Sequence, residues 1–247
     1  MIDRNRIALI IPARNEAASI SRVLRDIPDA VDHILVVDNG STDGTGDIAR
    51  AAGVAVIREN QPGYGRACLS GIDTLRHNPP AIVAFADGDG SDNHATLTEL
   101  LTPLVHDGLD LVLARRVPQN RAALSLQQRI GNRLATFLVG FFWGGDFRDL
   151  GPMRAIRWEA LRILDMRDRN YGWTIEMQIK ALQHRLRVRE IPLPYLPRLA
   201  GKSKISGTFG GVIRAGGKIL WTVAREAWRD RRATWLGRYE RKKDASG

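Results

Sequence analysis

"IALIIPARNEAASISRVLRDI", residues 7–27, sets a short apolar run directly before an amphipathic stretch. The apolar run is typical of a strand buried on both faces, and the stretch after it is typical of a helix that covers such a strand. The same succession continues to residue 116, with expected strands at 7–13, 33–38, 54–59, 81–87 and 110–116 and expected helices at 16–27, 42–52, 64–76 and 95–104. This alternation predicts an α/β fold in which a mostly parallel central sheet carries helices on both faces.

The regular alternation ends near residue 120. Residues 124–144 are a long helix candidate, and whether their apolar part, 134–143, belongs to the core or to a membrane interface stays open. The longest apolar run, 134–145, is shorter than the roughly 20 residues that span a bilayer, so no membrane-spanning segment is expected. A single cysteine, Cys68, excludes an internal disulfide and a cysteine-rich zinc site, and favours a reducing compartment.

The formal net charge of +10 is concentrated at one end of the chain. From Arg198 onward there are 13 lysines and arginines against 4 aspartates and glutamates, whereas the preceding chain is close to neutral. Charge confined to one end is typical of a surface that meets a partner. The candidate partners are anionic lipid, nucleic acid and an acidic small substrate.

An acidic cluster follows the expected strand 81–87. Asp87 and Asp89 are separated by Gly88 and followed by Gly90, and this spacing suits Mg²⁺ or Mn²⁺ held against phosphate oxygens. Taken alone, the stretch is more typical of a turn rich in Asp and Gly than of a metal site. Other polar groups, at residues 14–16 and at Asp38, also follow strands, and in parallel sheets ligands bind beyond the carboxyl ends of the strands. The combination favours a ligand site.

Several stretches occur in the order and spacing of family-two nucleotide-sugar glycosyltransferases: "IIPARNEAASI", "VVDNGSTDGT", "PGYGRACLSGI", "AFADGDGSD" and "DLVLARRV". The later "YGWTIEMQIKAL" and "GKSKISGT" are similar to the dolichol-phosphate mannose synthase-like branch, and the resemblance covers about residues 7–220. It implies a GT-A fold, a divalent metal (Mg²⁺ or Mn²⁺) and a nucleoside-diphosphate sugar donor. It also implies a glycosyltransferase domain at 1–207, with a nucleotide-binding half (1–117) and an acceptor-binding half (118–207), before a basic helical tail at 208–247.

The resemblance also assigns roles to individual residues. The nucleotide pocket would be lined by Pro12, Ala13, Arg14 and Glu16, with Asp38 on the base or ribose. Asp87 and Asp89 would hold the metal and the diphosphate. Arg116 matches the arginine that closes the usual Gly-Ser-Arg stretch, which here reads Ala114-Arg115-Arg116. Ser91 stands where the mannose synthases can have a glutamine ligand, so the third protein ligand stays open, with His94 as a candidate.

The acceptor decides which further groups the reaction needs. A lipid phosphate is already anionic and needs only cationic groups, for which Arg198, Lys202, Ser203 and Lys204 are suited. A sugar hydroxyl would need a carboxylate base, and Asp149 and Glu176 are the candidates. Both acceptor classes stay open at this point.

The tail, expected to be one helix at about 208–236, separates its charges from its apolar residues. At about 100° per residue its basic side chains share an arc of roughly 60°. These are Arg214, Lys218, Arg225, Arg229 and Arg232, opposite Phe209, Val212, Ile219, Leu220 and Val223. With tryptophans at 221, 228 and 235, this pattern predicts a helix lying flat in a membrane interface. The alternative is a helix packed on the domain with a solvated basic face.

The sequence as a whole predicts an inverting glycosyltransferase, peripheral at the inner face of the cytoplasmic membrane. It would transfer a hexose from a donor of the GDP-mannose or UDP-glucose type to polyprenyl or dolichyl phosphate. The alternative acceptor is a hydroxyl of a saccharide or of a lipid-linked saccharide in cell-envelope glycan synthesis. Nucleic-acid binding leaves the acidic strand ends unexplained, and a dinucleotide dehydrogenase would need a G-x-G-x-x-G motif after the first strand.

Overall fold

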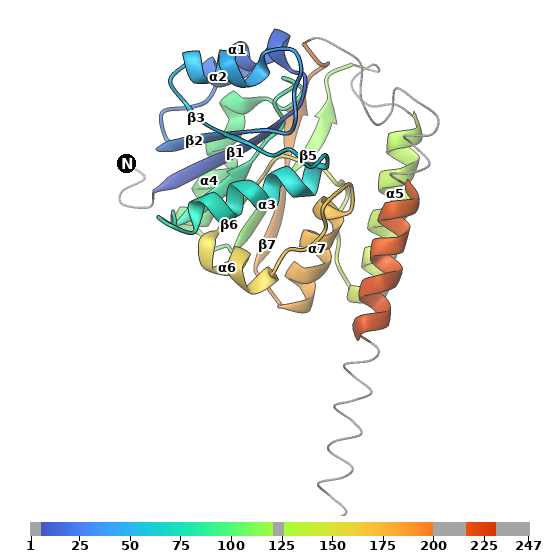
Figure 1. Ribbon diagram of the computed structural model, residues 1–247. Helices are drawn as coiled ribbons and strands as arrows, with labels where there is room; N and C mark the ends of the chain where they lie inside the picture. Colours follow the sequence, from blue (N-terminus) through green and yellow to red (C-terminus); the bar gives the residue numbers. More distant parts are fainter. Residues whose placement is uncertain (1–5, 121–125, 200–215, 231–247) are drawn as a thin grey trace, which may run out of the picture.

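The computed structural model describes residues 6–120, 126–199 and 216–230 (Figure 1). Its centre is a seven-stranded sheet in the order β3-β2-β1-β4-β6-β5-β7. The strands are β1 (Ile7–Ala13), β2 (His33–Asp38), β3 (Ala55–Arg58), β4 (Ile82–Phe85), β5 (Leu111–Pro118), β6 (Arg154–Arg157) and β7 (Val188–Tyr195). Only β6 runs antiparallel to its neighbours, β4 and β5, among these paired strands. The mostly parallel α/β fold predicted from the sequence is confirmed.

Helices cover both faces of the sheet, because the strands are apolar on both sides. Leu9 and Ile11 of β1 contribute to one buried cluster, which also takes in α1 (Ala17–Arg25), α2 (Thr45–Ala51) and α4 (Leu97–His106). Ala8 and Ile10 contribute to the opposite cluster, with α3 (Tyr64–Leu75), α6 (Trp158–Leu164) and α7 (Trp173–Gln183). A short 3₁₀ helix, η1 (His94–Thr96), precedes α4. Alternate side chains of one strand therefore stabilise both layers.

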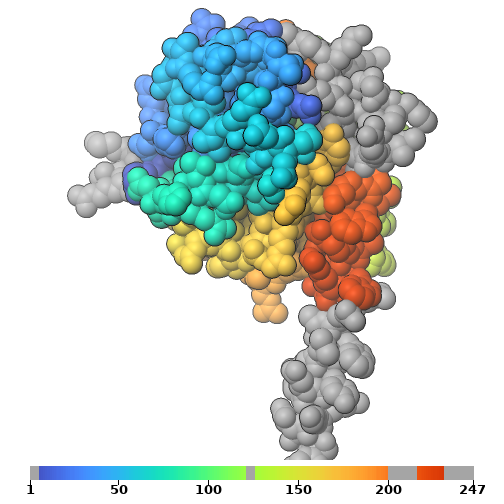
Figure 2. Space-filling model, viewed as in Figure 1, coloured from blue at the N-terminus to red at the C-terminus, as the bar shows by residue number. Residues whose placement is uncertain are grey.

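A third, smaller core joins α5 (Leu126–Trp143) to α7 and to a helix at 216–230. Ala135 and Val139 of α5 are buried there against Ile175, Ile179 and Val223. The helix at 216–230 lies beside α5 (Figure 1), and Figure 2 shows it seated against the body of the protein. The rest of the tail helix expected at 208–236 lies outside the described residues. No helix in the described part of the chain is both long and apolar enough to cross a membrane.

Candidate active site

The carboxyl ends of β1 and β4 open onto a cavity of about 160 Å³. The parallel pairing of these strands brings the segment after β1 next to the acidic segment after β4. Described residues lining the cavity include Pro12, Ala13, Arg14, Glu16, Asp87, Asp89 and Arg198. The first six were predicted from the sequence to surround the nucleotide and its diphosphate, and the structure brings them together. We call this space the donor cavity.

Three carboxylates crowd the segment after β4. Burial, followed by the charges of Asp89 and Asp92, raises the pKa of Asp87 well above its usual value. Burial raises the pKa of Asp92 to about 7, although its carboxylate accepts a hydrogen bond of 2.9 Å from the Asp87 backbone N–H. Asp87 Oδ1 is buried without a hydrogen-bond partner in the described part of the protein. Burial and mutual repulsion therefore disfavour the ionised forms of these carboxyl groups, and a cation bound at the unpaired Asp87 oxygen would stabilise them.

Asp89 is held from both sides. Its Oδ1 accepts hydrogen bonds from the Ser91 backbone N–H at 2.8 Å and from Ser91 Oγ at 2.5 Å. Its Oδ2 lies 2.6 Å from Nη2 of Arg198, whose Nη1 is 3.6 Å from Glu16. Ser91 therefore orients the Asp89 carboxylate. The sequence comparison had raised this position only as a possible third metal ligand.

The protein ligands available here fit Mg²⁺ or Mn²⁺ only if oxygens of the substrate complete the coordination shell. Within the described residues, no three His, Cys, Asp or Glu side chains converge as a complete metal site. His94 is buried behind the acidic segment, with Nδ1 2.9 Å from the Asp92 carbonyl oxygen. Asp87 and Asp89 offer carboxylate oxygens of the kind that hard cations prefer, and Mg²⁺ commonly binds one or two carboxylates and completes its shell with water and phosphate.

Asp38, predicted to contact the base or ribose, is not among the described residues that line the donor cavity. Its carboxylate is buried and accepts a hydrogen bond of 2.8 Å from the Ser41 N–H, which closes the turn after β2. The next residue, Asn39, lines the cavity instead. Its amide donates to the carbonyl oxygen of Gln61 at 2.7 Å and accepts from the N–H of Gly63 at 2.9 Å. A contact between Asp38 and nucleotide remains a prediction.

Sequence reasoning missed one wall of the donor cavity. Gly63, Tyr64 and Ala67, around the start of α3, line it together with Tyr171. The Pro-Gly pair before Tyr64 signals a turn into a helix but not its direction. Tyr171 belongs to an irregular segment between α6 and α7, and it begins the stretch "YGWTIEMQIKAL" on which the family resemblance partly rests, although that resemblance assigned it no role.

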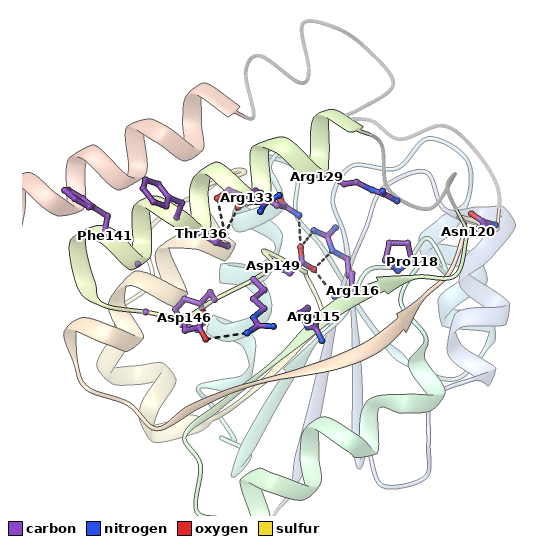
Figure 3. A pocket seen from close by; sticks show the side chains of 16 residues that line it. Arg115, Arg116, Pro118, Asn120, Arg129, Arg133, Thr136, Phe141, Asp146 and Asp149 are labelled. Carbon is purple, nitrogen blue, oxygen red and sulfur yellow. Dashed lines mark hydrogen bonds and ion pairs between the residues drawn. The ribbon is translucent and has the colours of Figure 1, made fainter.

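A second cavity of about 1000 Å³ lies between β5, α5 and the segment after α5 (Figure 3). Its described lining combines cations with aromatic rings: Arg115, Arg116, Arg129, Arg133 and Arg148 with Phe137, Phe141 and Phe147. We call it the arginine cavity. Such a surface suits a ligand that is anionic at one end and apolar along its length.

Arg116 and Asp149 meet in the arginine cavity. Arg116 Nε and Nη2 lie 2.7 and 2.8 Å from the two Asp149 oxygens, and the Arg116 backbone N–H donates to Asp149 at 3.0 Å. Asn132 adds a hydrogen bond of 2.6 Å. Burial alone would lower the pKa of Arg116, but the Asp149 charge more than offsets it and raises the pKa above its usual value. Asp149, predicted as a candidate base, instead fixes Arg116 in place.

Tyr195 connects the two cavities. The Arg116 guanidinium lies 5.2 Å from the centroid of the Tyr195 ring, and the Tyr195 backbone forms an isolated bridge with Asp92. Burial raises the pKa of the Tyr195 hydroxyl to about 12. The acidic segment of the donor cavity and the cationic lining of the arginine cavity are therefore joined through one residue.

Glu176, the other candidate base, is not in the described lining of either cavity. Its side chain is completely buried, and its carboxylate accepts a hydrogen bond of 2.7 Å from the Asp168 N–H. It also forms an ion pair of 3.0 Å with Lys180, one helical turn along. This carboxylate is held by a cation and by backbone N–H groups and is not in the described lining of either cavity, so the arrangement favours a structural role, and a catalytic role for Glu176 stays a prediction.

Of the predicted acceptor-phosphate residues, the structure describes Arg198. Arg198 lies in the donor cavity on Asp89, whereas Lys202, Ser203 and Lys204 lie outside the described residues. In the tail, the predicted solvent- or membrane-facing basic stripe needs correction at two of its residues: Lys218 lies 3.0 Å from Asp168, and Arg225 lies 3.6 Å from Glu176. These cations turn inward because buried carboxylates face them.

Residues 8–163, well over half of the chain, match the family model described as "Glycosyl transferase family 2". The chain belongs to glycosyltransferase family 2.

Relatives across this glycosyltransferase family support the same placement. An uncharacterised glycosyltransferase of Mycobacterium tuberculosis is 37% identical over 209 residues, 85% of this chain and 94% of the relative. A dolichyl-phosphate hexose transferase of Haloferax volcanii is 31% identical, with 89% and 94% covered. An undecaprenyl-phosphate mannosyltransferase of Micrococcus luteus is 32% identical, with 83% and 90% covered.

Solved structures place the family-2 glycosyltransferase chain in the GT-A fold. Glucosyl-3-phosphoglycerate synthase of Mycobacterium tuberculosis, crystallised with Mn²⁺, UDP and glucosyl-3-phosphoglycerate, superposes with a TM-score of 0.70. The match covers 89% of this chain and 80% of that one at 23% identity. The resemblance stated from the sequence, including its fold, is confirmed.

Proposed function

We propose that this glycosyltransferase moves a hexose, with inversion, from a nucleoside-diphosphate sugar to polyprenyl or dolichyl phosphate. The observation that carries the proposal is the arginine cavity, because five arginines beside exposed phenylalanines suit a phosphate attached to an apolar chain. The names of relatives at about 30% identity agree with this acceptor class.

The donor cavity would take the nucleoside-diphosphate sugar. Asp87 and Asp89 would hold Mg²⁺ or Mn²⁺, which supplies Lewis-acid assistance to the departing diphosphate. Glu16 orients Arg198 beside Asp89 in the described structure, and the guanidinium is placed to contact diphosphate oxygens. Asn39 and Tyr171 would shape the nucleotide pocket.

A phosphate acceptor explains why neither candidate base is free. An oxygen of the acceptor phosphate forms the new bond to the sugar carbon while the bond from that carbon to the diphosphate breaks. The attacking oxygen is already anionic, so no group has to remove a proton. Asp149 can then be committed to Arg116, which with its neighbours Arg129, Arg133 and Arg148 would hold the acceptor phosphate. Arg198, Lys202, Ser203 and Lys204 remain predicted phosphate contacts.

The outer face of α5 supports association with a membrane. Its apolar side chains recur every three or four residues, so they share one face. They are Leu126, Ile130, Leu134, Phe137 and Phe141, with exposed fractions between 46% and 73%. Arg129 and Arg133 lie on the same helix, and an apolar stripe bordered by arginines suits an anionic bilayer surface. We place the enzyme peripherally at the cytoplasmic face of the membrane, docked through α5.

The test is transfer of labelled sugar. The full chain is incubated with labelled GDP-mannose or UDP-glucose, Mn²⁺ or Mg²⁺, and polyprenyl phosphate in anionic vesicles. We expect one donor to give a labelled glycolipid that mild acid cleaves. Label transferred to a saccharide hydroxyl, with no glycolipid from either donor, would overturn the proposal in favour of the hydroxyl acceptor.

A further inference from the structure

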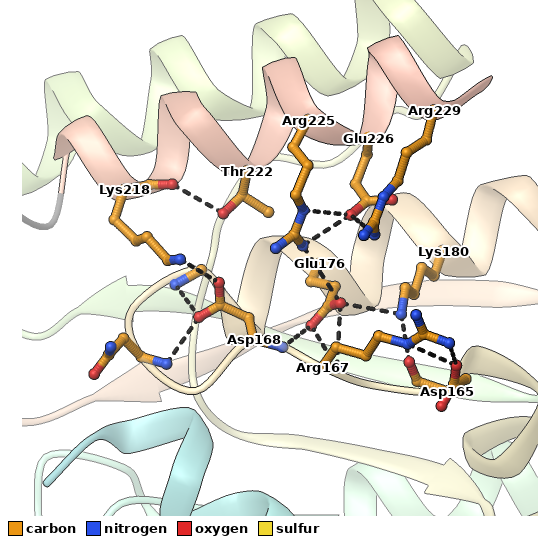
Figure 4. Close-up of polar contacts among 12 residues, drawn as sticks. Asp165, Arg167, Asp168, Glu176, Lys180, Lys218, Thr222, Arg225, Glu226 and Arg229 are labelled. Carbon is orange, nitrogen blue, oxygen red and sulfur yellow. Dashed lines mark hydrogen bonds and ion pairs between the residues drawn. The ribbon is translucent and has the colours of Figure 1, made fainter. Parts of the chain in front are cut away.

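An irregular segment at 165–172, between α6 and α7, lies against the helix at 216–230 (Figure 4). We call it the 165–172 loop. It carries Tyr171, which lines the donor cavity. It also carries Asp168, whose side chain is completely buried although it is charged. A buried carboxylate requires partners, and the partners of Asp168 indicate what holds the loop.

Two buried carboxylates fix the backbone of the loop. Asp168 Oδ1 accepts hydrogen bonds from the N–H groups of Asn170 and Gly172, at 2.8 and 3.2 Å. Glu176, at the start of α7, accepts hydrogen bonds from the N–H groups of Arg167 and Asp168. The conformation of the loop therefore depends on where these two carboxylates lie.

The helix at 216–230 supplies cations to the same two carboxylates (Figure 4). Lys218 Nζ lies 3.0 Å from Asp168 Oδ2, the oxygen on the other side from the loop amides. Arg225 Nη2 lies 3.6 Å from Glu176 Oε1 and 2.8 Å from Glu226. Trp221 stands between the two cations, 4.3 Å from Lys218 Nζ and 4.9 Å from the Arg225 guanidinium, measured to its ring centroid. Each carboxylate thus links the loop to the helix.

The backbone of the loop also approaches the helix closely at Gly172. A Cβ atom built there would overlap the Thr222 hydroxyl and the Asp168 carboxylate. Thr222 itself is completely buried. Only glycine leaves room for this contact, so the helix packs directly on the loop as well as pairing with its charges.

The opposite side of the loop rests on the wall of the donor cavity. The Arg66 N–H donates to the Arg169 carbonyl oxygen at 2.9 Å, which ties the loop to the first turn of α3. Gly63 and Gly65 bring the α3 backbone so close to residues 168 and 169 that a side chain at either glycine would overlap them. The loop is thus held between α3 and the helix at 216–230.

We propose that the helix at 216–230 is a positioning element of the donor site. Lys218 and Arg225 are positioning residues: through Asp168 and Glu176 they set the 165–172 loop, and through it Tyr171 and the start of α3. The identity of the ligand rests on the proposed function, whereas the control of the loop by the helix does not.

The chain offers a matched pair of variants for the test. Arg225→Gln and Arg229→Gln remove the same charge from the same helix. Both arginines form an ion pair with Glu226, but only Arg225 forms one with Glu176 as well, within the described residues. Lys218→Met is paired with Lys218→Arg, which keeps the cation. Gly172→Ala tests the close approach, with Gly217→Ala as its control because a Cβ there meets no described atom within 4 Å.

Two readouts on the full chain separate loop control from ligand identity. Hydrogen exchange followed by mass spectrometry reports the amides of residues 167, 168, 170 and 172 without any ligand. Calorimetry reports the Kd of UDP and of GDP in the presence of Mn²⁺. We expect Arg225→Gln, Lys218→Met and Gly172→Ala to speed exchange in the loop and to weaken nucleotide binding by about tenfold. Arg229→Gln, Lys218→Arg and Gly217→Ala should stay within twofold of the parent protein, roughly the scatter of such comparisons.

Loop exchange in Arg225→Gln and Lys218→Met that matches Arg229→Gln would overturn the proposal. So would faster exchange with an unchanged nucleotide Kd, because the loop would then move without affecting the donor cavity. If the parent protein binds neither nucleotide, the proposed function fails, and the exchange data alone decide whether the helix controls the loop.

Discussion

Arg198 and Asp89 form an ion pair of 2.6 Å at the donor cavity, joining the segment after β7 to the acidic segment after β4. The Asp89 side chain is only 3% exposed, so polar neighbours take the place of water around its carboxylate. The carbonyl oxygen of Asp89 also accepts a hydrogen bond of 3.2 Å from the Leu199 N–H. The segment that leads into the predicted acceptor loop is therefore attached to the predicted metal ligand.

Replacing Arg198 with Gln should destabilise the protein in the absence of metal, because a nearly buried carboxylate loses its cation. We expect a loss of about 1–3 kcal/mol in the free energy of unfolding, measured by urea denaturation. Mn²⁺ should restore part of this loss in Arg198→Gln and add less to the parent. Arg22→Gln, which breaks an exposed pair with Asp26, serves as the control. Equal effects of Mn²⁺ on both proteins would contradict the assignment of Asp89 as a metal ligand.

Replacing Asp89 with Asn should lower the rate of sugar transfer by about a hundredfold or more, because the leaving diphosphate loses its metal-bound stabilisation. Initial rates at saturating donor and Mn²⁺ measure the effect. Asp47→Asn removes a carboxylate that is 84% exposed and should leave the rate unchanged. A folded Asp89→Asn protein with the parent rate would show that the cation site lies elsewhere.

Asp149 and Arg116 should behave as one unit. Asp149→Asn frees the guanidinium to turn away, so we expect kcat/KM for polyprenyl phosphate to fall by about thirtyfold or more. The double variant with Arg116→Gln should be no worse than Arg116→Gln alone. Asp73→Asn, on an exposed pair with Arg76, provides the control. Independent, additive losses confined to kcat would instead favour a proton-accepting role for Asp149.

The outer face of α5 should control binding to vesicles. Phe137→Ser combined with Phe141→Ser removes two exposed rings, and the partition coefficient onto anionic vesicles should fall by about tenfold or more. Sedimentation with sucrose-loaded vesicles measures it. Ile163→Ser, an equally polar change at an exposed position on α6, should have no effect. Parent-like binding by the double variant would rule out α5 as the docking surface.

The sequence predicts the donor cavity better than any other part of the site. Residues 12–16 and 87–89 lie at or just beyond the carboxyl ends of β1 and β4, and the parallel pairing of these strands places both ends at one edge of the sheet. By contrast, β6 reads "RAIR", and its first residue, Arg154, is completely buried beside Trp173. Burial lowers the pKa of Arg154 to about 10. Nothing in a four-residue pattern with two arginines indicates a central antiparallel strand.

Partners from distant segments explain the remaining errors. The sequence predicts a basic arc facing away from the protein in the tail helix, but Lys218 and Arg225 face Asp168 and Glu176, which belong to another part of the chain. Likewise, Glu176 stands in a motif shared with glycosyltransferases, and its spacing to Lys180 is compatible with a helix-surface pair. Local sequence patterns do not encode the tertiary packing that buries this pair and lets Glu176 hold the 165–172 loop.

The helix at 216–230 has two sides with different neighbours. Thr222 and Val223 face the protein, whereas Trp221 and Trp228 are more than half exposed. A bilayer that contacts these tryptophans and a nucleotide in the donor cavity would favour the same placement of the helix. Reciprocity of linked equilibria then requires each to raise the affinity of the other by the same factor. The enzyme would then bind its sugar donor with higher affinity at a membrane surface than away from it.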